Sequence, residues 1–349
     1  MPRMTEAPLS HPLALALQGG GAHGAFTWGV LDHLLAAGLR PAGLSGTSAG
    51  ALNAAALASG WARAGQEGAR ATLTTLWEGV SALGGPLQPS PASYLVHGWN
   101  QDWSVRYQAF KATTQVASPY QFNPAGFNPL RELLQDCLDW SALTGPDAPP
   151  LFVSATEVET GRLRIFDNHS LDVTALLAST CLPTLFQAVE RNGRHYWDGG
   201  FAANPALHPL LTHASADDLL LLQLMPQRTA DGPPREPGEI LRRSRELSFS
   251  THLYRELQWL ALQQADCGPG SRWSLSPLRR RIARLRFHHL TGDRDLAGLG
   301  TASQLNADWP FLCHLRDAGR KAADDWLATH GGQVGRTSSR PLSDFLPTD

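Results

Sequence analysis

The chain has 349 residues, of which 42% are hydrophobic, and a formal net charge of −2. This length and apolar content suffice for one large core or two smaller ones. The charge disfavours nucleic acid as the main partner, because binding a phosphate backbone requires a basic excess or a basic stripe. No run approaches the roughly 18 to 20 apolar residues of a spanning helix, and residues 1–10 lack the apolar segment of a signal peptide. We therefore expect a cytoplasmic protein.

The cysteines lie apart in the sequence and lack the paired spacing of a metal site. Scattered cysteines without such pairing are expected to be reduced and mostly buried thiols. The sequence predicts no metal site and no other cofactor. The four positions are Cys137, Cys181, Cys267 and Cys313.

Two β-loop-α units open the chain. Residues 13–17 are apolar throughout, as in a strand covered on both faces by helices, and a glycine-rich loop and a helical pattern up to Gly38 follow. The apolar run 42–45 and the alanine-rich stretch 51–59 repeat this plan. Two such units in succession predict a parallel sheet with helices on both sides.

The turn of the second unit is Gly46-Thr47-Ser48-Ala49-Gly50, a G-x-S-x-G pattern between strand and helix. Because Gly46 and Gly50 have no Cβ, strand and helix can approach closely and hold Ser48 in a strained conformation. The Ser48 hydroxyl would stand at a helix N-terminus, where the helix dipole and free N–H groups favour a bound oxyanion. The pattern is typical of a catalytic nucleophile, and a simple packing turn is the alternative.

The loop of the first unit is Gly19-Gly20-Gly21-Ala22-His23-Gly24. The N–H groups of its four glycines could converge on one oxygen, as an oxyanion hole requires. A nucleotide phosphate loop is disfavoured, because the segment lacks the Lys-Ser/Thr of a P-loop and the G-x-G-x-x-G spacing. His23 and Thr47 are candidates to line the site, and a partly exposed loop position is the alternative that we favour for His23.

A third glycine-flanked segment, Tyr196-Trp197-Asp198-Gly199-Gly200, lies far downstream. It predicts a carboxylate at a strand end, on a turn that requires glycine. Taken with the other two segments, Asp198 supplies the base that a serine nucleophile needs.

Together these segments resemble the patatin-like phospholipase family. The resemblance also covers the stretch LFVSATEVETGRLRIF at 151–166, residues 178–183 and Asn204-Pro205, and so most of residues 13–225. It implies a three-layer α/β/α fold with a mainly parallel sheet, and an acyl hydrolase with a Ser48–Asp198 dyad and the glycine loop as oxyanion hole. Many family members have arginine where this chain has His23, so a phospholipid head group is less strongly indicated.

Residues 88–127 interrupt the α/β alternation with a proline- and aromatic-rich stretch. Such an insertion could be a lid or an acyl-binding wall, and an ordinary packed insertion explains the aromatic residues equally well. We hypothesise that Trp99 and Trp103 line the substrate entrance.

The whole chain is expected to divide into four parts. These are an N-terminal arm at 1–12, a hydrolase core at 13–226, an α/β extension at 227–330 packed on that core, and a tail at 331–349. The extension has helical patterns at 240–264 and 310–328 and a strand-like run at 282–290. The tail is rich in Gly, Ser and Pro, which predicts disorder. Two arginine clusters, at 242–245 and 279–286, are interpreted as solvated faces, with an anionic membrane surface as the alternative.

The leading functional hypothesis is an esterase or lipid acyl hydrolase. The alternatives are a hydrolase of hydroxyalkanoate esters or polyester oligomers, and a non-catalytic module that binds a lipid or a partner. The tryptophan content is compatible with peripheral membrane contact, and the oligomeric state stays open. A Ser-His-Asp triad is the competing mechanism. Its candidate histidines are His195, His252, His288 and His289.

Overall fold

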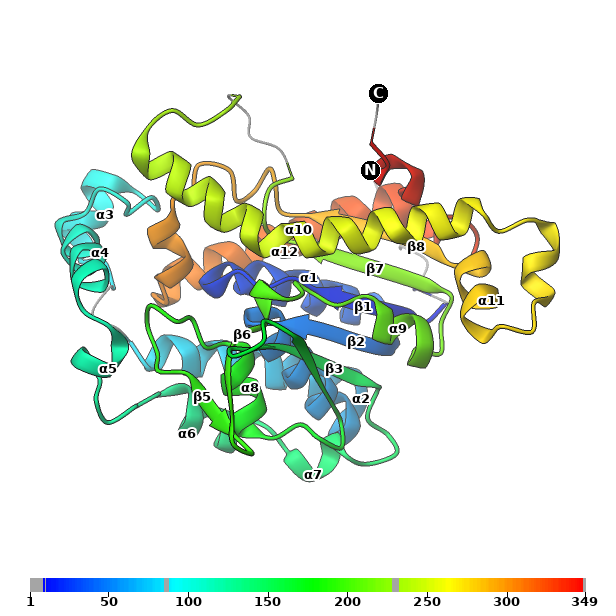
Figure 1. The fold of residues 1–349 in the computed structure, drawn as a ribbon, viewed down its shortest axis with the longest axis horizontal. Helices are drawn as coiled ribbons and strands as arrows, with labels where there is room; N and C mark the ends of the chain where they lie inside the picture. The colour runs from blue at the N-terminus through cyan, green and yellow to red at the C-terminus, as the bar shows by residue number, and fades with distance from the viewer. Residues whose placement is uncertain (1–8, 10, 85–87, 228–231, 348–349) are drawn as a thin grey trace, which may run out of the picture.

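The computed structural model describes residues 9, 11–84, 88–227 and 232–347, without the side chains of residues 269 and 272. Most of the predicted N-terminal arm and part of the linker after residue 226 lie outside these residues. The described residues form an eight-stranded sheet in the order β5-β6-β3-β2-β1-β7-β8, with β4 also paired to β3 (Figure 1). The strands are β1 Leu13–Leu17, β2 Pro41–Thr47, β3 Leu151–Glu157, β4 Leu163–Asp167, β5 Val189–Arg191, β6 Arg194–Asp198, β7 Asp218–Gln223 and β8 Arg286–Thr291.

The sheet is parallel from β8 to β3 and antiparallel beyond. Each neighbouring pair among β8, β7, β1, β2 and β3 is parallel, whereas β3 pairs antiparallel with both β4 and β6, and β5 with β6. The mainly parallel sheet predicted from the two β-loop-α units is confirmed. Because β8 comes from the C-terminal extension and pairs with β7, the extension completes the central sheet.

Helices cover both faces of this sheet, as the three-layer prediction requires. The α-helices are α1 Gly24–Ala36, α2 Ala49–Ala82, α3 Pro91–His97, α4 Val105–Val116, α5 Pro119–Phe122, α6 Leu130–Cys137, α7 Trp140–Leu143, α8 Val173–Ser179, α9 His208–His213, α10 Pro237–Ala265, α11 Pro277–Arg284 and α12 Trp309–His330. The 3-10 helices are η1 Gly21–His23, η2 Gly199–Phe201, η3 Pro269–Trp273, η4 Thr301–Leu305, η5 Gly331–Gln333 and η6 Leu342–Phe345.

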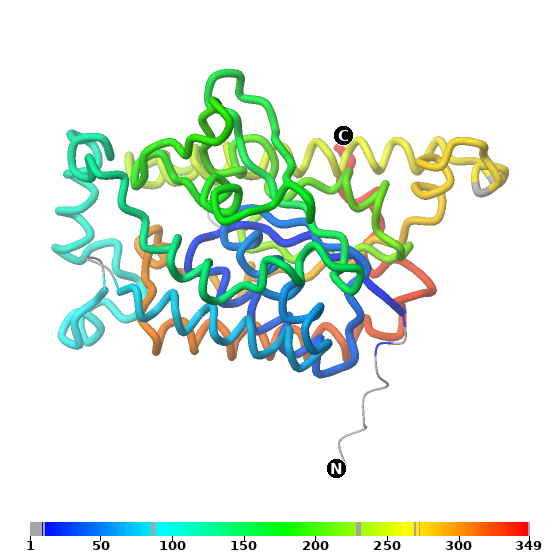
Figure 2. The backbone as a smooth tube through the Cα atoms, turned by 90° about the horizontal axis from the view of Figure 1, so that it is seen from below, coloured from blue at the N-terminus to red at the C-terminus, as the bar shows by residue number. Residues whose placement is uncertain are grey.

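The two faces of β1 show how the core is divided. Successive side chains of a strand point to opposite faces, and Leu13, Leu15 and Leu17 pack with α1, α2 and α12, whereas Ala14 and Ala16 pack with α9 and α10. Figure 2 shows α10 on one side of the sheet, and α2 and α12 on the other. A strand buried on both faces must be apolar throughout, which explains the uninterrupted apolar run at 13–17.

The C-terminal tail does not follow the prediction of disorder. Its residues 331–347 lie against the body, and Leu342 and Phe345 are buried in the core layer beneath α10. Phe345 packs edge-on against Phe287 of β8, with ring centroids 5.7 Å apart. The prediction of disorder from composition was wrong for residues 331–347, because a few buried apolar side chains and specific polar contacts suffice to hold a polar segment in place.

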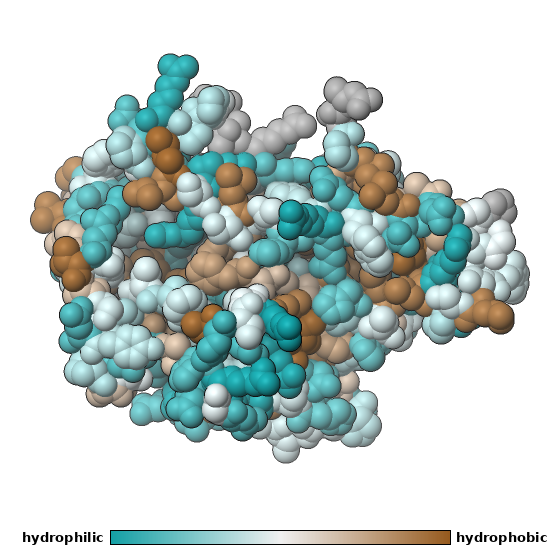
Figure 3. Space-filling view, viewed as in Figure 1, coloured by the Kyte–Doolittle hydropathy of each residue, from teal (hydrophilic) through white to brown (hydrophobic). Residues whose placement is uncertain are grey.

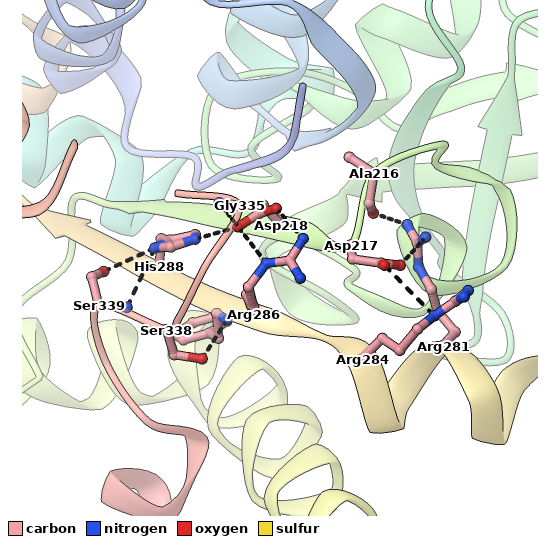
Figure 4. Close-up of polar contacts among 11 residues, drawn as sticks. Ala216, Asp217, Asp218, Arg281, Arg284, Arg286, His288, Gly335, Ser338 and Ser339 are labelled. Atoms are coloured by element: carbon pink, nitrogen blue, oxygen red, sulfur yellow. Dashed lines mark hydrogen bonds and ion pairs between the residues drawn. The ribbon is translucent and has the colours of Figure 1, made fainter. Parts of the chain in front are cut away.

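A buried polar cluster fixes the same tail at the start of β7 and β8 (Figure 4). Asp218 accepts from Arg286 at 3.0 and 2.7 Å, from His288 Nε2 at 2.9 Å and from the Gly335 N–H at 2.9 Å. Burial opposes its ionisation, but the hydrogen bonds from His288 and Arg286 hold the pKa of Asp218 well below its usual value. The backbone N–H of Ser339 donates to His288 Nδ1 at 3.3 Å, so this histidine links Asp218 to the tail.

Within the described residues, no helix combines the length and apolar character that crossing a bilayer demands. Those residues likewise contain no cluster of three or more potential metal-ligating side chains. All four cysteines are free thiols.

Candidate active site

Ser48 occupies a sharp turn between β2 and α2. Its φ of 55° and ψ of −126° lie in a region that a residue with a Cβ rarely adopts, so the turn is strained as predicted. A Cβ at Gly46 would lie 2.4 Å from the Gly50 carbonyl oxygen, and one at Gly50 would lie 2.1 Å from the Leu17 carbonyl oxygen. The two glycines therefore allow the close approach that was inferred from the pattern, and Ser48 stands at the N-terminus of α2.

The register of β3 brings Asp198 to this turn. Thr47, the last residue of β2, pairs with Ser154, and Asp198, the last residue of β6, pairs with Ala155, the next residue of β3. Residues 48 and 198 therefore lie where the ends of β2 and β6 meet against adjacent residues of β3, although 150 positions separate them in the sequence. The backbone of Asp198 is held by the Cys181 carbonyl at 2.8 Å and the Thr156 hydroxyl at 2.8 Å.

The Asp198 carboxyl is fully buried and titrates unusually. Burial raises its pKa from 3.8 to about 7, partly offset by hydrogen bonds from the Gly200 N–H and the Ser48 side chain. The Gly200 N–H donates to Oδ1 at 2.8 Å, whereas Oδ2 has no partner of ordinary hydrogen-bond geometry among the described residues. We infer that the Ser48 hydroxyl is close enough to affect the carboxyl, but not aligned in a regular hydrogen bond. Loose geometry of this kind is common in unliganded active sites.

Gly199 and Gly200 are required for space, and not for a turn conformation that only glycine can adopt. Neither has a positive φ. A Cβ at Gly199 would lie 2.2 Å from the Ser154 carbonyl oxygen, and one at Gly200 would lie 2.1 Å from the Phe249 ring. The correction concerns the reason for the glycines, and the placement of Asp198 at a strand end is confirmed.

The glycine loop lies directly against the serine turn. A Cβ at Gly19 would be 2.7 Å from the Ser48 Cβ, and one at Gly24 would be 2.7 Å from the Ala49 Cβ. The Gly19 N–H already donates to Asn204 Oδ1 at 2.7 Å, and the Gly24 N–H to the carbonyls of Gly21 and Ala22. These two amides are therefore not free donors, contrary to the prediction.

The amides of Gly20 and Gly21 differ from those two. Among the described residues neither N–H has a hydrogen-bond partner. Gly21 has a φ of 60°, which glycine adopts without strain, and its Cα faces the Gln304 carbonyl oxygen of η4. Two unpaired N–H groups are thus available in the loop whose first glycine, Gly19, packs against Ser48.

His23 and Thr47, both candidates to line the site, are buried structural residues. His23 is only 6% exposed, not a partly exposed loop residue, and its Nε2 lies 2.7 Å from the Ser303 hydroxyl. Burial lowers its pKa to about 4, so the imidazole is neutral near pH 7. The Thr47 hydroxyl donates to the Ala203 carbonyl at 2.8 Å and ties β2 to the segment after Asp198.

The two tryptophans placed at the entrance have different environments. Trp99 packs between Tyr94 and the α12 side chains Phe311 and His314, with ring centroids 5.1 to 5.3 Å apart, so it anchors the insertion. Trp103 is 78% exposed. The hypothesis that both tryptophans line the substrate entrance stays a prediction.

The histidines of the competing triad find partners elsewhere. His195 pairs with Glu159, His288 with Asp218, and His289 with Gln223 and Arg340. His252 is exposed on α10. No described hydrogen bond joins any of the four to Ser48 or Asp198, which disfavours a histidine relay.

Sequence reasoning missed three residues that hold the site together. The Ser179 hydroxyl accepts the Ser48 N–H at 3.0 Å, and the Gln18 side chain accepts the N–H groups of Leu224 and Met225 at 2.8 Å each. Asn204 binds the Gly19 N–H. Ser179 and Asn204 lie within segments that carry the family resemblance, so a signal for them was present in the sequence.

The fold and the placement of Ser48 define an α/β/α protein with a strand-turn-helix serine of the kind found in serine hydrolases. The family model described as patatin-like phospholipase matches residues 15–211. The chain belongs to this family, which is one of lipid acyl hydrolases.

The crystal structure of VipD from Legionella pneumophila is similar over 93% of this chain and 68% of that chain, with 14% identity and a TM-score of 0.42. No curated protein matches the sequence significantly.

Proposed function

We propose that the chain is a serine acyl hydrolase that cleaves carboxylic ester bonds of lipids, with Ser48 as nucleophile and Asp198 as general base. The observation that carries the proposal is the fully buried Asp198 carboxyl, with one oxygen unpaired, next to the hydroxyl of the strained Ser48. Burying a carboxyl costs free energy, and groups with strongly shifted pKa values cluster at functional sites. The family supports lipids as the substrate class.

The raised pKa improves the match between base and nucleophile. An ordinary aspartate, with a pKa of roughly 4, accepts a proton from serine poorly. With a pKa of about 7, Asp198 takes the Ser48 proton at Oδ2 while the Gly200 N–H keeps Oδ1 in place. The serine oxygen bonds to the acyl carbon, and the departing alcohol receives the proton from Asp198. In the second step, water attacks the acyl-enzyme and Asp198 takes its proton. Asp198 then returns the proton to the Ser48 oxygen, which releases the acid and restores the Ser48 hydroxyl.

We assign the oxyanion hole to the unpaired amides of Gly20 and Gly21. An oxyanion needs donors that are already oriented and not otherwise engaged. Gly19 and Gly24 contribute by permitting the loop to approach the serine turn. Removing one oxyanion donor typically lowers turnover by about 10²- to 10³-fold.

The test is covalent labelling with a fluorophosphonate, which reacts with activated serines. We expect labelling of the wild type and of Ser248→Ala, a variant of an exposed serine on α10, and none of Ser48→Ala or Asp198→Asn. A folded wild type that resists labelling would identify a non-catalytic binding module. Release of fatty acid from phospholipid, compared with hydrolysis of short hydroxyacid oligomers, then separates the lipid substrate from the polyester alternative.

A further inference from the structure

The helices α3 and α4 expose an unusual number of large apolar side chains. Neither helix has a fully buried residue. We define the α3–α4 surface by side chains that are exposed by 75 to 90%, and Figure 3 shows apolar groups over these helices at the left of the molecule. Exposed apolar patches on a globular protein mark sites of interaction. The residues are Leu95, Val96, Trp103, Val105 and Val116.

This surface is held firmly on its inner side. The Tyr94 hydroxyl donates to Asp308 at 2.9 Å, and Trp99 stacks on His314 of α12. The Asp102 carboxylate accepts the N–H groups of Thr301 and Ala302 at 3.1 and 2.6 Å. Because the insertion is anchored by these contacts, its apolar outer face is a built feature of the fold.

The charge on this surface is positive. Residues 88–127 contain one acidic residue, Asp102, and it points inward to η4. Arg106 and Lys111 form no ion pair with an acidic side chain of the described residues. Arg245 of α10 lies close enough to Tyr107 of α4 to oppose the rise of the tyrosine pKa that burial causes. Apolar side chains among unpaired cations are complementary to a membrane surface with anionic head groups.

The surface also connects to the candidate active site. Asp102 binds the first residues of η4, and the same short helix contacts the glycine loop through Ser303 and Gln304. The insertion lies at the end of the sheet where the strands β1 and β2 lead into the glycine loop and the serine turn (Figure 1). A lipid drawn from a membrane at this surface would therefore start at the same end of the sheet as the site.

We propose that the α3–α4 surface docks on an anionic lipid bilayer, with Leu95 and Trp103 inserted among the lipids and the nearby cations facing the head groups. The purpose of this docking, delivery of a lipid ester to Ser48, rests on the proposed function. The binding itself does not, and it can be measured without hydrolysis.

The experiment compares two matched pairs of substitutions in the full chain carrying Ser48→Ala. One pair is Leu95→Ser with Trp103→Ser, exposed by 90 and 78%. The control pair is Leu275→Ser with Trp273→Ser, exposed by 96 and 86% near α11 at the opposite end of the molecule (Figure 1). The residue types and the exposures are alike, so both pairs should leave the thermal midpoint unchanged.

Binding is measured by co-sedimentation with phosphatidylcholine vesicles, with or without phosphatidylserine. We expect the parent and the control pair to bind phosphatidylserine vesicles more strongly and to lose binding at high salt. The Leu95/Trp103 pair should bind at least roughly tenfold more weakly, because two large apolar groups no longer enter the lipid. No binding by the parent, or equal binding by both pairs, would overturn the proposal.

An apolar surface of this kind could instead be covered by a second copy of the chain. Sedimentation velocity without lipid tests this by measuring the oligomeric state. A parent dimer that the Leu95/Trp103 substitutions dissociate would likewise overturn the proposal. Loss of fluorophosphonate labelling with vesicle binding intact would instead refute the hydrolase and leave the docking surface standing.

Discussion

The imidazole of His23 lies 2.7 Å from the hydroxyl of Ser303, and the contact joins the glycine loop to η4 of the C-terminal extension. The Ser303 hydroxyl itself donates to the Gly300 carbonyl at 2.6 Å, so the histidine must be the donor, through Nε2–H. The extension therefore supports the loop that we assign to the oxyanion.

Ser303→Ala should destabilise the chain by about 1–3 kcal/mol, because it leaves the buried Nε2–H of His23 without an acceptor. The same change should lower turnover by loosening the glycine loop. Urea unfolding measures the first effect and ester hydrolysis the second. Ser248→Ala, on an exposed face of α10, is the control and should stay within about 0.5 kcal/mol. Equal effects of the two changes would show that the contact has no role.

Hydrolysis should depend on the ionisation of Asp198. Since the base must be unprotonated, kcat/KM for a soluble ester should rise with pH and level off above about 7. A plateau that begins near pH 4 would show that the buried carboxyl keeps an ordinary pKa.

The same group should affect stability in the opposite direction. The folded state holds a proton on Asp198 up to about pH 7, whereas the unfolded state releases it near 3.8, so this group lowers stability as pH rises between those values. Asp198→Asn removes the effect. Its thermal midpoint relative to the wild type should therefore be higher at pH 8 than at pH 5, and a difference independent of pH would contradict this.

Gly50→Ala should destabilise the chain by at least about 3 kcal/mol, the upper end of the usual cost of overpacking. The reason is that the new Cβ would lie 2.1 Å from the Leu17 carbonyl oxygen. Gly238→Ala, in the first turn of α10, is the control, since its Cβ would meet nothing within 4 Å. That change should be neutral or slightly stabilising. Denaturant unfolding of the two variants compares them directly.

The tail provides a further test. Phe345→Ala should cost about 3–5 kcal/mol, because the ring is buried against Phe287. Phe127→Ala, with a ring that is 63% exposed, should cost little. Equal midpoints in urea would mean that the tail is disordered, as its composition indicated.

The sequence by itself determined the features that depend on neighbouring residues. Strand, glycine turn and helix are local, so the serine turn at 46–50 and the alternation of β1, β2 and their helices could be predicted from spacing and residue type. Those same local patterns gave the mainly parallel sheet and marked Asp198 as a strand-end carboxylate.

Only the tertiary structure decided which distant groups meet. The pairing of β3 with both β2 and β6 puts Asp198 beside Ser48, and burial there raises its pKa. The partners of Gly19 and His23, and the burial of Phe345, depend on segments up to 280 residues away in the chain. Hydrogen bonding and desolvation act through space, so residue type and local spacing do not specify them.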